Sequence, residues 1–267
     1  MTSLLCTEPR TILILGTGYL GRALAERLRE AGHIPLTADI DPQQAIYEAD
    51  MTDSASMHRL GGGTEAYRNL YTRGAENTLE AFPGKPVIFC SSTSVYGITD
   101  GRWVTEEHNV YPTTEKRRLL LQAEQAVLAA KGTVVRLAAL YGPERCILVS
   151  DYCAKGAALP GNMDRWMNYI HRDDAVSALF LLCTLRHPPR GIYNAADRTP
   201  MQLSEIYAYL SGLLGIPAPP PSPPRSGGRR GDTSQRVSCA RLLSLGWEPL
   251  YPSFADGVHN VLEALEE

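Results

Sequence analysis

The chain alternates between short apolar runs and amphipathic stretches, and this pattern predicts its elements. Ile12 to Leu15 form an uninterrupted apolar run, which is typical of a parallel strand buried on both faces. Apolar residues then repeat at helical spacing from Leu20 to Ala31, and Gly32 suits a C-terminal stop. Further strand candidates occupy residues 33–38, 87–91, 133–143 and 192–197. Strands that alternate with helices predict an α/β fold with a doubly wound parallel sheet.

A glycine-rich turn separates the first strand from the first helix. Gly16, Gly18 and Gly21 stand in GxGxxG spacing, in which the first permits a tight turn, the second lets the backbone approach a pyrophosphate, and the third lets the helix pack close to the strand. The amides of Tyr19 and Leu20 would face phosphate from the helix N-terminus. The flanking strand and helix favour a Rossmann-like dinucleotide site over an ordinary glycine turn.

An acid follows the second predicted strand. Asp39 lies about 20 residues after the glycine turn, the spacing at which a carboxylate takes the adenosine ribose hydroxyls. Asp41 is an alternative two residues later, and either residue could be a solvated loop acid. Because an acid repels a 2′-phosphate, we expect NAD as the cofactor, with NADP as the alternative.

Composition excludes several classes of function. The 267 residues carry a formal charge of −3, which gives no global attraction to nucleic acid or to anionic membranes. The six cysteines are scattered without CxxC pairs, and we expect reduced thiols and no metal site. The sequence shows no signal peptide and no apolar stretch of membrane-spanning length. We therefore expect a cytoplasmic protein.

Several motifs occur in one order along the chain: GTGYLG, the acid Asp50, YRNLYTRGAENTLEAF, SSTSVYG, RLAALYGP, IHRDD and YNAAD. With them, the chain resembles the extended and atypical short-chain dehydrogenase/reductases of the NAD-dependent epimerase/dehydratase group. The resemblance implies an NAD(P)-dependent oxidoreductase or epimerase/dehydratase that acts on a sugar-like or carbonyl substrate. It also implies a small-molecule substrate, such as a nucleotide sugar, and a homodimer formed through the helices near 67–82 and 113–130.

The resemblance also assigns candidate site residues. Ser92 would hydrogen-bond the substrate oxygen, whereas the cofactor would contact the glycine turn with its Tyr19 and Leu20 amides, Asp39, Asp50 and Ser91. The candidate substrate contacts are Thr93, His171 and Arg236. Each has a structural alternative: the hydroxyls at 91–94 could satisfy a strand end, His171 could be a packed histidine, and Arg236 could belong to a solvated basic loop.

The reactive Tyr/Lys pair of the resembled family is not found at its expected positions. Counting forward from Pro112 and backward from Glu124 locates the Tyr position at Lys116 and the Lys position at Leu120. Tyr111 and Lys116 are five residues apart, which does not place them on one helical face. Lys116 or Tyr96 would then have to supply the proton. Lys116 and its two following arginines could instead face a phosphate or lie in a solvated helical turn.

The fourth strand of a doubly wound sheet also has no counterpart in the sequence. Residues 54–66 contain no run of four apolar residues, and Gly61 to Gly63 close the interval. The loss would leave a slot beside the first strand, because the usual strand order places the fourth strand there. Either the strand at 87–91 closes against the first strand, or residues are missing from the sequence.

We expect two domains. Residues 9–150 and 167–197 would form the dinucleotide-binding domain, and residues 151–166 and 198–267 would form a small substrate lobe. We expect this lobe to contain a short helix at 203–214 and a proline-rich loop at 217–231. Two further hypotheses for the whole chain stay open beside the enzyme. One is a non-catalytic NAD(P)-binding sensor or interaction protein, and the other is a compromised fold that binds nothing.

Overall fold

A computed structural model describes residues 5–39, 47–48, 68–155, 162–218, 220 and 233–266. The chain divides into two compact units, which are described separately. The first unit comprises Met1–Val95, Pro112–Arg136 and Ala175–Tyr193, and the second comprises Tyr96–Tyr111, Leu137–Asp174 and Asn194–Glu267. The domain boundaries expected from the sequence lie elsewhere and stay a prediction.

The first unit contains two three-stranded sheets, with orders β1-β2-β3 and β10-β6-β4. Its elements are β1 (Thr11–Leu15), α1 (Tyr19–Glu30), β2 (Ile34–Asp39), β3 (Tyr47–Glu48), the π-helical turn η1 (Arg68–Arg73), α4 (Gly74–Ala81), β4 (Ile88–Ser92), α5 (Glu115–Ala129) and β6 (Thr133–Leu137). The 3-10 turn η2 (Thr93–Tyr96), α7 (Arg172–Thr184) and β10 (Gly191–Ala195) cross the boundary between the units, as does β6 with its last residue, Leu137. Strands β1, β2 and β3 pair in parallel, which together with the intervening helix α1 confirms the predicted α/β fold of Rossmann-like type.

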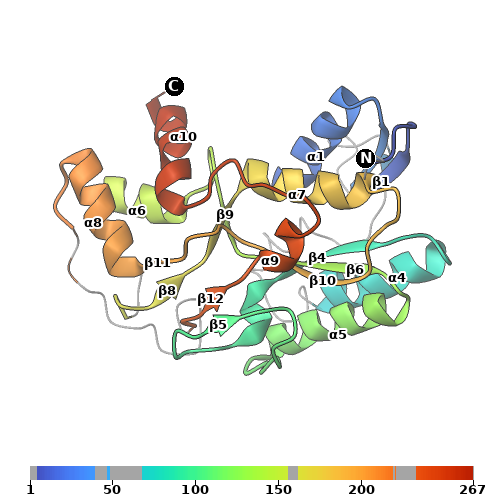
Figure 1. The fold of residues 1–267 in the computed structure, drawn as a ribbon, viewed down its shortest axis with the longest axis horizontal. Coiled ribbons are helices and arrows are strands. Elements are labelled where there is room, and N and C mark those ends of the chain that lie inside the picture. Colours follow the sequence, from blue (N-terminus) through green and yellow to red (C-terminus); the bar gives the residue numbers. More distant parts are fainter. Residues whose placement is uncertain are drawn as a thin grey trace. The chain divides into compact units, whose positions relative to one another are not determined.

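Helices α4 and α5 pack on the β10-β6-β4 sheet. Ala75 of α4, Ala123 and Val127 of α5, and Val134 of β6 form one buried apolar cluster. Figure 1 shows both helices below the strands β4 and β6. Thr114 caps α5, since its hydroxyl accepts a hydrogen bond from the backbone N–H of Arg117. The cluster explains why the apolar positions of α5 recur at helical spacing.

Strands β1 and β4 belong to separate sheets in the described part of the chain. The expectation of a first strand buried on both faces is therefore wrong: only Ile14 of β1 is buried, and Leu13 is 38% exposed. Cys90 of β4 is also exposed. β1 and β4 do not pair directly, and residues 54–66, where the fourth strand was not found, lie outside the described residues.

The second unit surrounds an aromatic core. Its elements are β5 (Trp103–Val104), β7 (Ala139–Tyr141), α6 (Ile147–Lys155), β8 (Trp166–Met167), β9 (Tyr169–His171), β11 (Met201–Gln202), α8 (Leu203–Leu214), β12 (Arg236–Val237), α9 (Ala240–Leu243) and α10 (Phe254–Glu266). Strands β7 and β9 pair in parallel, as do β12 and β5, whereas β11 and β8 are antiparallel. Tyr141, Tyr169 and Phe254 meet in the core with ring centres 4.8 to 5.6 Å apart.

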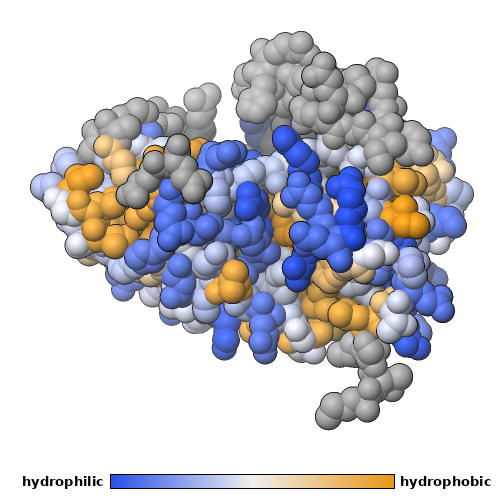
Figure 2. All heavy atoms as spheres, turned by 90° about the horizontal axis from the view of Figure 1, so that it is seen from above, coloured by the Kyte–Doolittle hydropathy of each residue, from blue (hydrophilic) through white to orange (hydrophobic). Residues whose placement is uncertain are grey.

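The predicted helix at 203–214 matches α8. A capping box between Gln202 and Glu205 begins it, and Gly215 ends it in the left-handed conformation with φ 67°. The proline-rich loop at 217–231 lies largely outside the described residues. Figure 2 shows one face of the molecule, on which hydrophobic side chains occur in separate groups between hydrophilic ones. In the described part, no helix is long and apolar enough to cross a membrane.

Candidate functional site

The glycine turn adopts the geometry that its spacing predicts. Gly16 has a φ of 95°, a conformation that residues with a side chain rarely adopt. A Cβ atom at Gly21 would lie 2.0 Å from the carbonyl oxygen of Gly16 and 3.3 Å from Cγ2 of Ile14. Only glycine at position 21 therefore allows α1 to pack this closely against the end of β1.

Gly18 leaves open space at the start of α1. It has a φ of −69°, and a Cβ atom there would meet no atom within 4 Å. As the N-cap residue of α1 it offers no side-chain hydrogen bond to the first turn, which begins with Tyr19 and contains no acid. An uncapped helix N-terminus with a bare backbone beside it can accept an anionic group such as a pyrophosphate.

Asp39 lies beside the glycine turn. Its Oδ2 accepts hydrogen bonds from the backbone N–H of Thr17 at 2.6 Å and from the Thr17 hydroxyl at 2.8 Å. The backbone N–H of Gly16 donates to the carbonyl of Ala38 at 2.9 Å, which ties the turn to the same strand. Asp39 is half-buried, so its carboxylate combines a fixed position with access to solvent. This arrangement suits a carboxylate that accepts hydrogen bonds from ribose hydroxyls.

The hydroxyl cluster at the end of β4 divides into buried and accessible members. The Ser91 hydroxyl is buried and donates to Oε1 of Glu124 at 2.5 Å, and Arg136 contacts the same carboxylate with Nε at 3.1 Å. Thr93 is also buried. The half-buried Ser92 Oγ accepts a hydrogen bond from the backbone N–H of Ser94 at 3.2 Å. Of the predicted contacts at this strand end, Ser92 is the one with partial access to solvent.

The first two turns of α5 contain Lys116 and Leu120, which share a helix face because they are four residues apart. Lys116 is exposed, whereas Leu120 is buried, as is the neighbouring Leu119. A lysine at position 120 would place its stem and ammonium group in an apolar environment. The helix therefore presents an amine at one position and a packed aliphatic side chain at the other.

Tyr96 has a buried hydroxyl that is engaged within the second unit. The side chain is fully buried, and its hydroxyl donates to Oδ1 of Asn194 at 2.8 Å. Asn194 is itself fixed, because its Nδ2 donates to the carbonyl of Ser238 and its backbone N–H donates to Glu106. These contacts give Tyr96 a structural role that accounts for its position.

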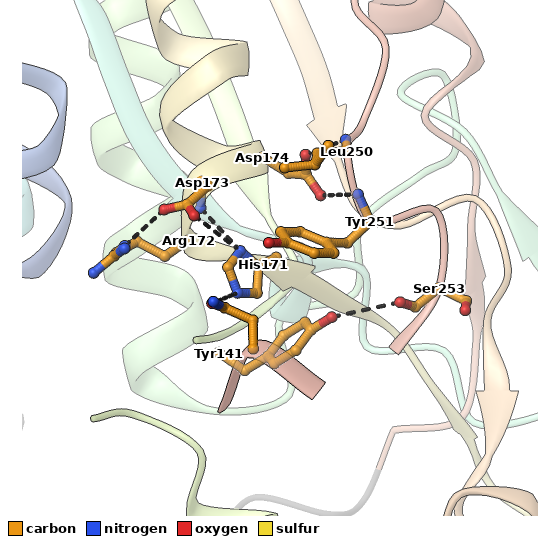
Figure 3. A network of polar contacts seen from close by, with 9 residues as sticks. Tyr141, His171, Arg172, Asp173, Asp174, Leu250, Tyr251 and Ser253 are labelled. Carbon is orange, nitrogen blue, oxygen red and sulfur yellow. Dashed lines mark hydrogen bonds and ion pairs between the residues drawn. The ribbon is translucent and has the colours of Figure 1, made fainter. Parts of the chain in front are cut away.

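His171 lies in a closed polar network at the end of β9 (Figure 3). Its Nδ1 accepts a hydrogen bond from the backbone N–H of Asp173 at 3.2 Å, so the ring hydrogen is on Nε2 and points to Oδ1 of Asn260 at 3.1 Å. The ring also lies 4.1 Å from the ring centre of Tyr251. Burial lowers the pKa of His171, and the ring is neutral. Both nitrogens are used within the fold.

Asp174 anchors a distant segment to the same network. Its Oδ1 accepts from the backbone N–H of Leu250 at 2.5 Å, and its Oδ2 accepts from the backbone N–H of Tyr251 at 3.0 Å (Figure 3). Desolvation by burial raises the pKa of Asp174 to about 6. Desolvation also raises the pKa of the buried Asp197 well above its ordinary value. Both acids lie away from solvent.

Arg236 lies in β12 against two tryptophans of the same unit. Its guanidinium carbon is 5.3 Å from the ring centre of Trp103 and 4.8 Å from that of Trp166. Its Nε donates to the carbonyl of Gly101 at 2.8 Å. Arg236, which the sequence predicted as a substrate contact, thus has its side chain fixed by contacts within the second unit.

Some relevant residues were not found from the sequence. Thr17 fixes Asp39, and Arg22 Nε donates to the carbonyl of Thr17 at 3.3 Å, which places a cation beside the turn. The sequence offered one indication of this role, since Thr17 places a hydroxyl between Gly16 and Gly18. Asp50 lies outside the described residues. Among the described residues, no group of three His, Cys, Asp or Glu side chains could hold a metal ion.

The model of the NAD-dependent epimerase/dehydratase family matches residues 12–196, more than half of the chain. The chain belongs to this family. The matched range includes the glycine turn, the hydroxyl cluster and the IHRDD segment. The family is NAD-dependent, which confirms the cofactor class expected from the turn and from Asp39. No curated protein matches the chain.

Solved structures agree with the family assignment. A protein from Methylobacillus flagellatus described as an NAD-dependent epimerase/dehydratase is 26% identical, with a TM-score of 0.75 over 99% of this chain and 100% of its own. The UDP-glucose 4-epimerase of Thermotoga maritima, solved with UDP-glucose, is 19% identical, with a TM-score of 0.78 over 96% and 98% of the two chains. MoeE5, solved with UDP-glucuronic acid and NAD, is 18% identical, with a TM-score of 0.74 over 97% and 99%. The last two likenesses show the fold.

Proposed function

We propose that this chain binds NAD at the glycine turn and acts on a nucleotide sugar as an oxidoreductase or epimerase. The observation that carries the proposal is the turn itself: Gly21 lets α1 approach β1, and Gly18 leaves its backbone bare beside an uncapped helix N-terminus. The pyrophosphate would lie against Gly18 and the amides of Tyr19 and Leu20, and Asp39 would accept from the ribose hydroxyls. Two relatives of the same fold, solved with UDP-sugars, support this substrate class.

The substrate chemistry would use residues at the end of β4 and the start of α5. When bound, NAD supplies the capacity to accept and return a hydride. Ser92 would hydrogen-bond the substrate oxygen, since it has partial access to solvent where Ser91 and Thr93 are buried. Lys116 would supply the proton to that oxygen when the carbonyl is reduced, because it stands where the resembled family has its tyrosine. Tyr96 is the weaker candidate, since its hydroxyl is buried on Asn194.

One observation favours a second candidate function, an NAD-binding sensor without chemistry. Leu120 is buried at the position where the resembled family has its lysine, so the cation that assists proton transfer in that family is replaced by core packing. Such a protein would still bind NAD and respond to it without converting a substrate. The two candidates share the cofactor site and differ only in chemistry.

Turnover measurements with matched variants distinguish these candidates. NAD binding is measured by calorimetry, and a panel of UDP-sugars is followed for NADH formation and for epimer exchange. For the enzyme, Lys116→Met lowers kcat by about 10²–10⁴-fold, the usual contribution of a proton-transfer group, with the NAD affinity unchanged. Lys85→Met, which removes an exposed lysine from a turn, leaves kcat unchanged. NAD binding without turnover of any panel member, unaffected by Ser92→Ala, establishes the sensor. Absence of NAD binding overturns both.

A further inference from the structure

A buried ion pair lies next to the hydroxyl cluster of the first unit. Glu124 of α5 and Arg136 of β6 are 0% and 2% exposed, and Nη2 of Arg136 lies 2.6 Å from Oε2 of Glu124. Nε of Arg136 adds contacts of 3.1 Å to Oε1 and 3.2 Å to Oε2. The loss of water around two charges is costly, and apolar residues of similar size often stabilise a fold equally well. Stability alone therefore gives little reason for this pair.

Glu124 also contacts the strand that carries the hydroxyl cluster. The hydroxyl of Ser91 donates to Oε1 of Glu124 at 2.5 Å, and Ser91 is buried as well. Oε1 thus accepts hydrogen bonds from Ser91 and from Nε of Arg136 together. Hydrogen bonds to a charged acceptor are shorter and stronger than those between neutral groups. Because Arg136 fixes the carboxylate, the carboxylate in turn fixes the Ser91 side chain at the end of β4.

The contact of Ser91 determines which way Ser92 faces. Both serines belong to β4, and successive side chains of a strand point to opposite faces. With the Ser91 hydroxyl held towards α5, the Ser92 hydroxyl faces away from Glu124. It is half-buried and accepts a hydrogen bond from the backbone N–H of Ser94 at 3.2 Å. The ion pair is therefore connected to the proposed substrate hydroxyl through one side chain and one peptide bond.

The place of Glu124 on α5 supports the same connection. Lys116, Leu120 and Glu124 follow one another at intervals of four residues, so they lie along one side of the helix. Lys116 is the proposed proton donor at the start of the helix, whereas Leu120 and Glu124 are buried. One side of α5 therefore carries both the proposed proton donor and the carboxylate that holds the end of β4.

We infer that Glu124, held by Arg136, is a positioning residue for the proposed reaction. It orients the end of β4 through Ser91, so that Ser92 presents its hydroxyl to the substrate oxygen. This inference rests on the proposed function, which assigns the substrate contact to Ser92. It gives Ser91 a role other than the cofactor contact that the resemblance implies.

Ser91→Ala tests the connection with a small change, because it removes one hydroxyl and leaves the ion pair in place. We expect kcat on the UDP-sugar panel to fall by up to about 10²-fold with KM unchanged, since the lost alignment acts on the transition state. NAD affinity, measured by calorimetry, should equal that of the wild type. Weaker NAD binding by Ser91→Ala would make Ser91 a cofactor contact and overturn the inference.

Thr133→Val is the matched control for this variant. Thr133 is a buried residue of β6 in the same sheet, and its hydroxyl donates to the carbonyl of Pro189. The substitution therefore removes a buried side-chain hydrogen bond that does not involve β4, and kcat should stay at the wild-type value. Equal kcat values for Ser91→Ala and Thr133→Val would overturn the inference.

A double-mutant cycle separates positioning from a purely structural role. If Ser91 acts through Ser92, Ser91→Ala lowers kcat in the wild type and has no further effect in the Ser92→Ala variant. A structural role that is independent of Ser92 would lower kcat by the same factor in both backgrounds. That result would overturn the inference.

Glu124→Met/Arg136→Met tests the ion pair by removing both charges together. We expect the melting temperature to be retained, because such replacements are often neutral or stabilising, and kcat to fall as it does in Ser91→Ala. A retained melting temperature with the wild-type kcat would overturn the inference, and if this variant does not fold, the cycle with Ser92→Ala decides. A wild type that binds NAD but converts no UDP-sugar overturns the proposed enzyme and the inference with it. Turnover by the wild type with no effect of Ser91→Ala overturns the inference alone.

Discussion

The glycine turn of the first unit and the IHRDD segment of the second are both motifs of the family, yet they use their polar groups in opposite ways. At the turn, Gly18 leaves the backbone bare and no side chain caps α1. At the second motif, both nitrogens of His171 and both oxygens of Asp174 already have partners in the fold. A shared motif therefore identifies a function only where its polar groups stay available to a ligand.

Substitution at Gly21 has the largest expected effect. In Gly21→Ala, the new methyl group would meet the carbonyl oxygen of Gly16, so α1 or the turn must shift. We expect a loss of about 1–3 kcal/mol in the free energy of unfolding, as for other overpacked sites, together with the loss of NAD binding. Chemical denaturation and calorimetry measure the two effects.

Gly212→Ala is the matched control for this substitution. Gly212 lies in α8, and a Cβ atom there meets nothing within 4 Å. We expect this variant to gain about 0.5–1 kcal/mol from its higher helix propensity. An unchanged stability of Gly21→Ala would contradict the close approach of α1 to β1.

Removal of the Asp174 carboxylate tests the closed network. Asp174→Ala leaves the backbone N–H groups of Leu250 and Tyr251 without their acceptor, which we expect to cost about 1–3 kcal/mol in stability. Asp173→Ala removes the neighbouring acid, whose side chain is 40% exposed and pairs with the partly exposed Arg172, and we expect a stability within about 1 kcal/mol of the wild type. If the NAD affinity of Asp174→Ala falls while its stability is retained, the network belongs to the ligand site and the contrast with the turn is wrong.

The pH dependence of stability gives a smaller effect with a defined sign. The pKa of Asp174 is about 6 in the folded protein, above its ordinary value of 3.8, so the folded state binds the proton more tightly than the unfolded state does. The wild type therefore loses stability relative to Asp174→Asn as the pH rises from about 4 to about 6, by at most roughly 1.4 kcal/mol for each pH unit in that interval. Burial lowers the pKa of His171, so the stability that its neutral ring contributes is lost as the pH falls below 6.5. The wild type and Asp174→Asn share this loss, which therefore cancels in their difference. If the difference in the free energy of unfolding between the wild type and Asp174→Asn did not change with pH, the burial of Asp174 would be contradicted.

The sequence predicted the elements that depend on neighbouring residues. The roles of Gly16 and Gly21 and the helix at 203–214 follow from local spacing and capping, and the structure has them. The exposure of Leu13 was not predictable from its apolar run, because it depends on which strand lies beside β1. The local sequence pattern therefore predicted the glycine turn better than it predicted the surroundings of β1 in its sheet.

Long-range contacts account for most of what sequence reasoning missed in the site. The hydroxyl of Tyr96 meets Asn194, and Arg236 reaches Trp103 only because β12 pairs with β5. Nε2 of His171 meets the amide side chain of Asn260 in α10, 89 residues further along the chain. None of these partners has a signal in the spacing of residues along the chain.

The central claim is that the bare backbone at Gly18 receives the pyrophosphate of NAD, and calorimetry of NAD with Gly18→Ala tests it most directly. Because the new Cβ atom meets no protein atom within 4 Å, the variant should lose no more than about 1 kcal/mol of stability, the cost of alanine at an N-cap position. It should bind NAD at least about tenfold more weakly, since the methyl group occupies the approach of the pyrophosphate. Equal NAD affinities for Gly18→Ala, Gly212→Ala and the wild type would contradict this claim.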